Sequence, residues 1–163
     1  MKYFIVNGKP CSGKDTFVNF CLEELSAFGK LISTVDFVKK IATECGWDGT
    51  KDLKNRKFLS DLKDLLTNWG DVPYTKTLQE IKLFYYDLEY YDVENSGVVF
   101  IMSREPEEIS RFEKELGAKS ILIRRNAVEF NEQSNHADSE VLNHKYHYII
   151  DNNDTLEELK ADI

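Results

Sequence analysis

The stretch GKPCSGKDT, residues 8–16, decides the fold of this chain. Its members are Gly8, Lys9, Pro10, Cys11, Ser12, Gly13, Lys14, Asp15 and Thr16. Gly8, Gly13 and Lys14 have the spacing GxxxxGK. An apolar run at residues 2–7 precedes them, and apolar residues at helical spacing follow over residues 14–28. In such a strand–loop–helix unit, backbone N–H groups and the positive end of the helix surround phosphate oxygens. The stretch therefore predicts a phosphate-binding loop, the P-loop.

The rest of the chain alternates short apolar runs with segments of helical periodicity. Strands are predicted at residues 2–7, 31–35, 98–102, 120–123 and 146–150. Helices are predicted at residues 14–28, 37–45, 52–69, 76–91, 106–116 and 155–163. Thr155 and Glu158 form a capping box at the start of the last helix, and Pro73 either breaks the pattern or starts a helix. Strands that alternate with helices indicate an α/β fold with a parallel sheet.

Length, charge and cysteine content narrow the class of protein. The 163 residues suit one domain, and the formal net charge of -8 argues against a nucleic-acid partner. No apolar run approaches the roughly 18 residues of a membrane span, so we expect no membrane partner. Cys11, Cys21 and Cys45 are odd in number and form no CxxC pair. They favour reduced thiols and a cytoplasmic location. The sequence leaves a monomer and a homodimer both open.

The end of the loop carries residues suited to a nucleoside triphosphate. We expect Lys14 to reach the β- and γ-phosphates of ATP. Asp15 stands where a hydroxyl residue usually follows the lysine, and Thr16 comes next. Asp15 either binds Mg²⁺, directly or through water, or simply favours the helix N-terminus as an anion. We expect Thr16 to contact phosphate or metal as well.

Three further stretches accompany the loop. They are Val35-Asp36-Phe37-Val38-Lys39 with GWDGTKDLKNRKFLSDL (46–62), SREPEEI (103–109), and Ser139-Glu140 with IIDNNDTLEEL (149–159). With them, the sequence resembles the phage-type deoxynucleoside monophosphate kinases, a branch of the P-loop kinases. The resemblance implies one P-loop kinase domain over residues 1–163, a three-layer α/β/α fold with a five-stranded parallel sheet. It also implies an acceptor-binding helical insert at about residues 36–91 and a lid at about residues 125–144.

The activity implied is transfer of the γ-phosphoryl group of ATP, with Mg²⁺, to a small phosphorylated acceptor, above all a (deoxy)nucleoside monophosphate. Such a reaction needs cations around the acceptor and the transferred group. We assign Arg104, Arg56 and Lys51 to the acceptor phosphate, since arginine binds phosphate bidentately. Asp36 follows the second strand and would orient the substrate or magnesium-bound water, or cap the next helix.

Arg124 and Arg125 follow the fourth strand, at the base of the predicted lid. We expect them to stabilise the transition state as the lid closes, the alternative being the solvated start of a helix. His136, His144 and His147 have no spacing typical of metal ligands.

One position departs from the family. Met102 stands where these kinases often carry an aspartate, two residues before Arg104. A carboxylate there usually positions Mg²⁺ or water in P-loop enzymes, so Asp15 or Asp36 would have to replace it. Two other functions remain open from the sequence. One is a kinase for another small acceptor, such as phosphomevalonate or dephospho-coenzyme A. The other is a nucleotide-binding regulatory protein with little turnover.

Overall fold

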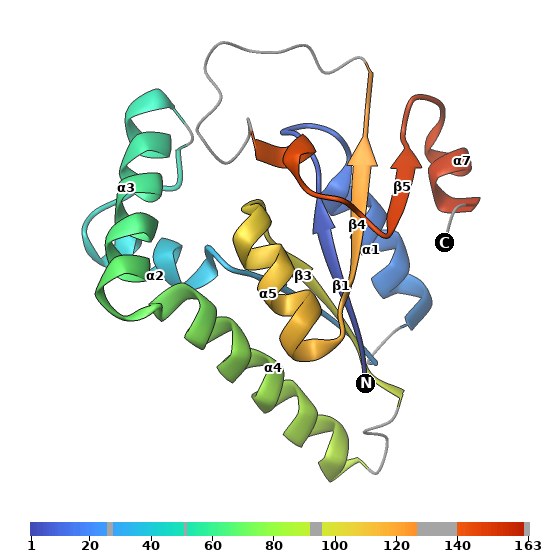
Figure 1. Ribbon diagram of the computed structural model, residues 1–163, viewed down its shortest axis with the longest axis horizontal. Helices are drawn as coiled ribbons and strands as arrows, with labels where there is room; N and C mark the ends of the chain where they lie inside the picture. The colour runs from blue at the N-terminus through green and yellow to red at the C-terminus, as the bar shows by residue number, and fades with distance from the viewer. Residues whose placement is uncertain (26–27, 51, 92–95, 127–139, 162–163) are drawn as a thin grey trace.

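A computed structural model describes residues 1–25, 28–50, 52–91, 96–126 and 140–161 (Figure 1). Its single described sheet has five parallel strands in the order β2-β3-β1-β4-β5. The strands are β1 (Lys2–Asn7), β2 (Gly29–Ser33), β3 (Val98–Met102), β4 (Lys119–Arg124) and β5 (Tyr148–Asp151). Because all five run the same way, their carboxyl ends meet at one edge of the sheet, at the top of Figure 1.

Helices cover both faces of this sheet (Figure 1). They are α1 (Lys14–Leu25), α2 (Asp36–Glu44), α3 (Leu53–Gly70), α4 (Val72–Tyr90), α5 (Pro106–Leu116) and α7 (Leu156–Ala161), with a 3₁₀ turn, η3 (Glu140–Asn143). One apolar core lies between the sheet and α4 and α5, and a second lies between the sheet and α1 and α7. This arrangement confirms the expected three-layer α/β/α fold with a five-stranded parallel sheet.

The inner strand β3, between β2 and β1, shows why the sheet needs cover on both sides. Val99 and Ile101 belong to the core beneath α4 and α5, whereas Val98 and Phe100 belong to the core beneath α1 and α7. Successive side chains of a strand point to opposite faces. A strand that is apolar throughout is therefore buried between two helical layers.

Several predicted boundaries are wrong by a few residues. The second strand is Gly29–Ser33 and not 31–35, because its register against β3 runs from Gly29–Val98 to Ser33–Met102. The fourth strand extends over Lys119–Arg124, and the fifth is Tyr148–Asp151 and not 146–150. Pairing with a neighbouring strand sets these limits, and the local sequence does not show which residues will pair.

Helix limits shift for local reasons. The first helix covers Lys14–Leu25, and residues 26–27 of its predicted range lie outside the described residues. The helix expected at 76–91 begins at Val72 and carries Pro73 in its first turn, where a missing N–H breaks no hydrogen bond. The predicted capping box is confirmed: the Thr155 N–H donates to Glu158 Oε2 at 3.0 Å, and the Glu158 N–H donates to Thr155 Oγ1 at 3.3 Å.

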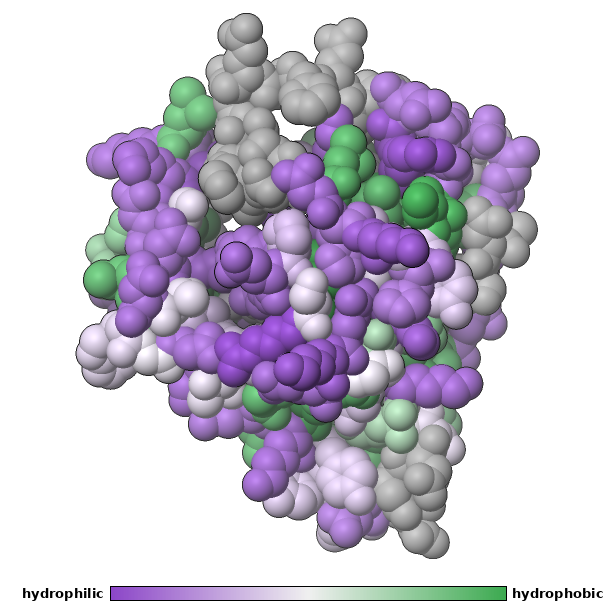
Figure 2. Space-filling model, in the orientation of Figure 1, coloured by the Kyte–Doolittle hydropathy of each residue, from purple (hydrophilic) through white to green (hydrophobic). Residues whose placement is uncertain are grey.

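The surface in Figure 2 is mostly hydrophilic, in keeping with the net charge of -8. Within the described ranges, no helix is both long enough and apolar enough to pass through a bilayer.

Candidate phosphate-binding site

The P-loop joins the carboxyl end of β1 to the first turn of α1, as the sequence predicted. Gly8 has φ 153° and Gly13 has φ 94°, a range of backbone angles that residues with a side chain rarely adopt. A Cβ atom on Gly8 would lie 2.4 Å from the Ile123 carbonyl oxygen, and one on Gly13 would lie 2.2 Å from Asn152 Nδ2. The two glycines therefore allow the loop to pack closely against β4 and against the residue after β5.

Lys14 completes the GxxxxGK motif of this loop and is the first residue of α1. Its side chain is buried, and its Nζ donates to the Lys9 carbonyl oxygen at 2.7 Å. The same carbonyl accepts from the Ser12 N–H at 3.2 Å. Ser12 Oγ is also buried and has no hydrogen-bond partner among the described residues. A buried polar atom in that state costs free energy until a ligand or water reaches it.

Two asparagines that the sequence analysis missed hold the two ends of the loop. Asn7 is fully buried, and its Oδ1 accepts from the Gly8 N–H at 2.7 Å. Asn152, directly after β5, donates from Nδ2 to the Ser12 carbonyl at 2.9 Å. A polar residue at the end of an apolar strand was the available signal for both, but their partners lie far away in sequence.

Arg104 lies between β3 and α5, at the same carboxyl edge of the sheet as the P-loop. Its carbonyl oxygen accepts from Asn7 Nδ2 at 3.2 Å, so its backbone is connected to the residue that precedes the loop. Arg56 lies in the first turn of α3. Lys51, the third predicted acceptor cation, lies outside the described residues. Binding of an acceptor by these cations stays a prediction.

Asp36 is the first residue of α2. Its carboxylate accepts from the Ser33 N–H at 2.9 Å and lies 3.4 Å from Lys39 Nζ. The N-cap position belongs to Val35 and has no side-chain cap, so the alternative that Asp36 caps this helix is wrong. Asp36 lines a pocket of about 350 Å³ between β2, α2 and α4. The described residues that line this pocket do not include Arg104 or any residue of the P-loop. The pocket therefore does not bring Asp36 together with them.

Lys63 was not among the predicted site residues, and it is the only buried residue of the fully described helix α3. Its Nζ donates to Glu105 Oε1 at 2.8 Å and to Glu108 Oε2 at 3.3 Å, and the Ser103 hydroxyl donates to the same Glu108 oxygen. Burial alone would lower the pKa of Lys63, but the carboxylates of Glu108 and Glu105 outweigh burial and raise it. A lysine between Leu59, Leu62 and Leu66 on an apolar helix stripe was the sequence signal.

This Lys63–Glu105–Glu108 triad gives the SREPEEI stretch a structural role. It fastens α3, part of the predicted acceptor-binding insert, to the start of α5 beside Arg104.

Arg124 ends β4 and forms a bidentate pair with Asp151, which ends β5, at 2.5 and 2.7 Å. The hydrogen bond and the opposite charge raise the pKa of Arg124 and lower that of Asp151. Arg125 is exposed at the start of the predicted lid. Residues 127–139, most of that lid, lie outside the described ranges, so the roles of both arginines stay predictions.

Oxygen atoms suited to Mg²⁺ are present at the start of α1. Asp15 is exposed and Thr16 is half-buried. Mg²⁺ takes hard oxygen ligands, commonly one or two from the protein and the rest from phosphates and water. Met102 ends β3 beside Val6 and Ser33, so no carboxylate stands at that position. Among the described residues, no three His, Cys, Asp or Glu side chains are grouped to hold a metal alone.

Two of the three histidines do converge, which their spacing did not predict. Glu113 Oε1 lies 3.1 Å from His144 Nε2 and 3.2 Å from His147 Nδ1, and it accepts from the Ser120 hydroxyl at 2.5 Å. Burial raises the pKa of Glu113, but the hydrogen bonds from Ser120 and His144 outweigh it and lower that pKa. His136 lies outside the described residues.

No family model matches the sequence, and no curated protein matches it. Solved structures of similar shape include an APS kinase from Mycobacterium tuberculosis, 10% identical, with a TM-score of 0.48 over 99% of this chain and 92% of that chain. Another is a sugar kinase from Janibacter sp., 13% identical, with a TM-score of 0.48 over 99% of this chain and 91% of that chain. Similarity at this level carries no argument about activity or substrate.

Proposed function

We propose that this protein transfers the γ-phosphoryl group of ATP to a small phosphorylated acceptor, above all a (deoxy)nucleoside monophosphate. The observation that carries the proposal is the P-loop itself, in which the buried Lys14 side chain places its Nζ on the Lys9 carbonyl. A lysine at this point of a glycine-rich loop lies where the phosphates of a bound nucleotide would reach it. A triphosphate lying in the loop would also offer a partner to the buried Ser12 hydroxyl.

The residues act by positioning and by charge. Backbone N–H groups of the loop and the N-terminus of α1 bind the β- and γ-phosphates, and Lys14 neutralises them. Mg²⁺, which Asp15 and Thr16 would hold through oxygen atoms, supplies further neutralisation of phosphate charge. Arg124 ends β4 and Arg125 follows it at the same edge of the sheet, and both would bind the oxygens of the transferred group.

Arg104 would bind the acceptor phosphate, because it follows β3 directly and its backbone is joined to Asn7 beside the loop. Arg56 and Lys51 would add charge from the insert, and Asp36 would orient the acceptor. A monophosphate acceptor is already anionic at neutral pH, so it needs little help from a base. The positioning of Mg²⁺ or water, which a carboxylate at position 102 usually performs, would fall to Asp15 or Asp36.

Met102 favours a second candidate, a nucleotide-binding regulatory protein with little turnover. The carboxylate that usually positions Mg²⁺ or water at the end of this strand is missing. The two candidates differ in a single measurable property, turnover, and share tight ATP binding.

An ADP-release assay over a panel of nucleoside and deoxynucleoside monophosphates separates them, with ATP binding measured in parallel. We expect turnover with at least one monophosphate. Lys14→Ala should abolish that turnover while the protein stays folded, because Lys14 belongs to the loop. Lys119→Ala is the matched control, since Lys119 is exposed at the opposite end of β4. Tight ATP binding without turnover for every monophosphate would favour the regulatory protein. Normal turnover of Lys14→Ala would remove the P-loop assignment.

A further inference from the structure

Asn7 is a buried side chain with partners on three separate segments. Its Oδ1 accepts from the Gly8 N–H at 2.7 Å, and its Nδ2 donates to the Arg104 carbonyl at 3.2 Å and to the Tyr146 hydroxyl at 2.7 Å. The Gly8 N–H can only donate, and the Arg104 carbonyl can only accept. A flipped amide would face donor with donor and acceptor with acceptor, so the Asn7 side chain has one workable orientation.

Tyr146 strengthens that orientation. Its hydroxyl accepts from Asn7 and donates to the Val141 carbonyl at 2.7 Å. Val141 belongs to η3 and is buried. Burial raises the pKa of Tyr146 to about 12, so the hydroxyl keeps its proton at neutral pH and continues to donate. A chain of two hydrogen bonds thus anchors the Asn7 amide to the buried residue Val141, in the turn before β5.

We propose that Asn7, oriented by Tyr146, is a positioning residue that sets the P-loop against Arg104 during phosphoryl transfer. This inference rests on the proposed function, in which the loop holds the donor phosphates and Arg104 the acceptor phosphate. One amide bonds the first residue of the donor loop and the backbone of the acceptor arginine, so it fixes the distance between them. Transfer rates depend steeply on this kind of alignment, and a displacement of about 1 Å can cost about a hundredfold.

Tyr146→Phe tests the inference, because it removes one hydroxyl and keeps the ring. Tyr74→Phe is the matched control: Tyr74 is buried, and its hydroxyl donates to Glu115 Oε2 at 2.8 Å, among α4 and α5 residues. We expect both variants to lose similar thermal stability. Only Tyr146→Phe should lower kcat, by about tenfold, with the KM for ATP changed by less than about threefold. Asn7→Ser, whose short side chain cannot reach all three partners, should shift kcat in the same direction.

The outcomes separate the two proposals. A wild-type protein without turnover for any acceptor overturns the proposed function and this inference with it. A wild-type protein that turns over, with Tyr146→Phe kinetically equal to Tyr74→Phe, overturns the inference alone. Hydrogen exchange of the wild-type Gly8 amide adds a test that needs no variant. Exchange at the rate of an unprotected amide would also overturn the inference, whereas slow exchange supports the bond to Asn7.

Discussion

The Lys63–Glu105–Glu108 triad makes a sharp prediction about stability. In Lys63→Met, the apolar stem is kept and the charge is lost, so two carboxylates lose their common partner. The Glu108 side chain is only 10% exposed, whereas that of Glu105 is 37% exposed and partly screened by water. Removing one partner of a buried ion pair costs about 3–5 kcal/mol. Because of Glu105's exposure, we expect the lower limit, about 3 kcal/mol, or a Tm lower by roughly 6–12 °C for a chain of this size.

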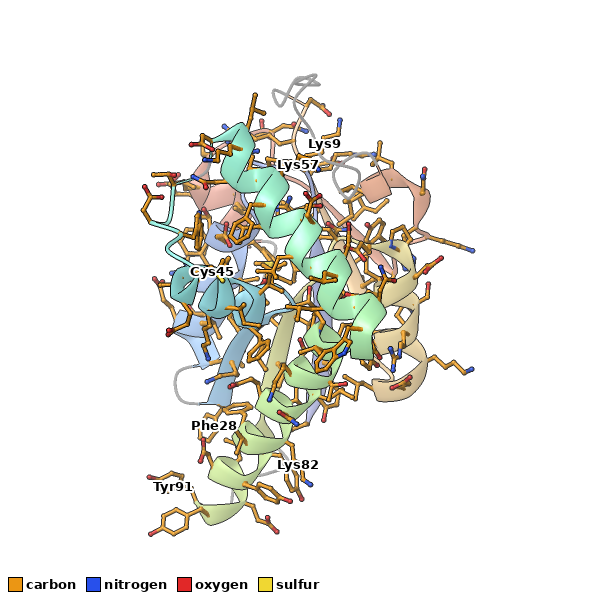
Figure 3. All side chains as sticks on the ribbon, turned by 90° about the vertical axis from the view of Figure 1, so that its left-hand side faces the viewer. Lys9, Phe28, Cys45, Lys57, Lys82 and Tyr91 are labelled. Atoms are coloured by element: carbon orange, nitrogen blue, oxygen red, sulfur yellow. The ribbon has the colours of Figure 1, made fainter. Side chains whose placement is uncertain are left out.

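Lys57→Met is the matched control on the same helix (Figure 3). Lys57 lies 2.8 Å from Asp61, but the two side chains are 76% and 60% exposed. An exposed i,i+4 pair contributes only about 0.3–0.5 kcal/mol. The measurement is urea-induced unfolding at pH 7 for the wild-type protein and both variants. Equal losses in Lys63→Met and Lys57→Met, within about 0.5 kcal/mol, would refute the argument that burial makes this triad important.

The pH dependence gives the triad a second test. The folded pKa of Lys63 is raised above its ordinary value of 10.5. The contribution of Lys63 to the free energy of unfolding is therefore complete below that value and is lost as the pH rises through the folded pKa. The stability difference between the wild-type protein and Lys63→Met should therefore be complete at neutral pH and shrink as the pH rises through the folded pKa of Lys63.

Two further predictions concern Arg104 and Glu113. Arg104→Ala should raise the acceptor KM about 10- to 100-fold, the loss expected for hydrogen bonds to a charged group. The KM for ATP should stay unchanged, and the acceptor KM of Arg104→Lys should lie between those of the wild-type protein and Arg104→Ala. An unchanged acceptor KM would contradict the assigned role. Because the folded pKa of Glu113 is lowered from 4.5, its contribution is present above that value and is lost as pH falls through the folded pKa. Glu113→Gln should therefore be less stable than the wild-type protein at pH 7, by about 1.5 kcal/mol, and equally stable in acid. The exposed residue Glu107 provides the control, Glu107→Gln. A stability difference that persists in acid, or an equal loss of stability in Glu107→Gln, would contradict this.

The sequence predicted those parts of the fold that depend on nearby residues. Apolar runs located all five strands, and the spacing of Gly8, Gly13 and Lys14 located the loop between β1 and α1. The Thr155–Glu158 capping box was also predictable, because it needs residues only three apart. Strand limits were less accurate, since the ends of β2 and β5 depend on pairing with β3 and β4.

The candidate site divides in the same way. Its loop could be read from the sequence, but the residues that support the loop could not. Asn7 bonds to Arg104, 97 residues away, and to Tyr146, 139 residues away. Asn152 bonds to Ser12 across 140 residues. Lys63 meets Glu105 and Glu108 only because the fold brings α3 within side-chain reach of the start of α5.

By itself, then, the sequence determined a strand–glycine loop–helix unit within an α/β chain, because backbone conformation and apolar periodicity are local properties. Only the tertiary structure decided which polar side chains meet at the carboxyl edge of the sheet. The order β2-β3-β1-β4-β5 places β1 between β3 and β4. With that order, Gly8 after β1 and Arg104 after β3 both bond to the buried Asn7 amide, and Asn152 after β5 bonds to the P-loop. No local sequence pattern encodes the order of the strands.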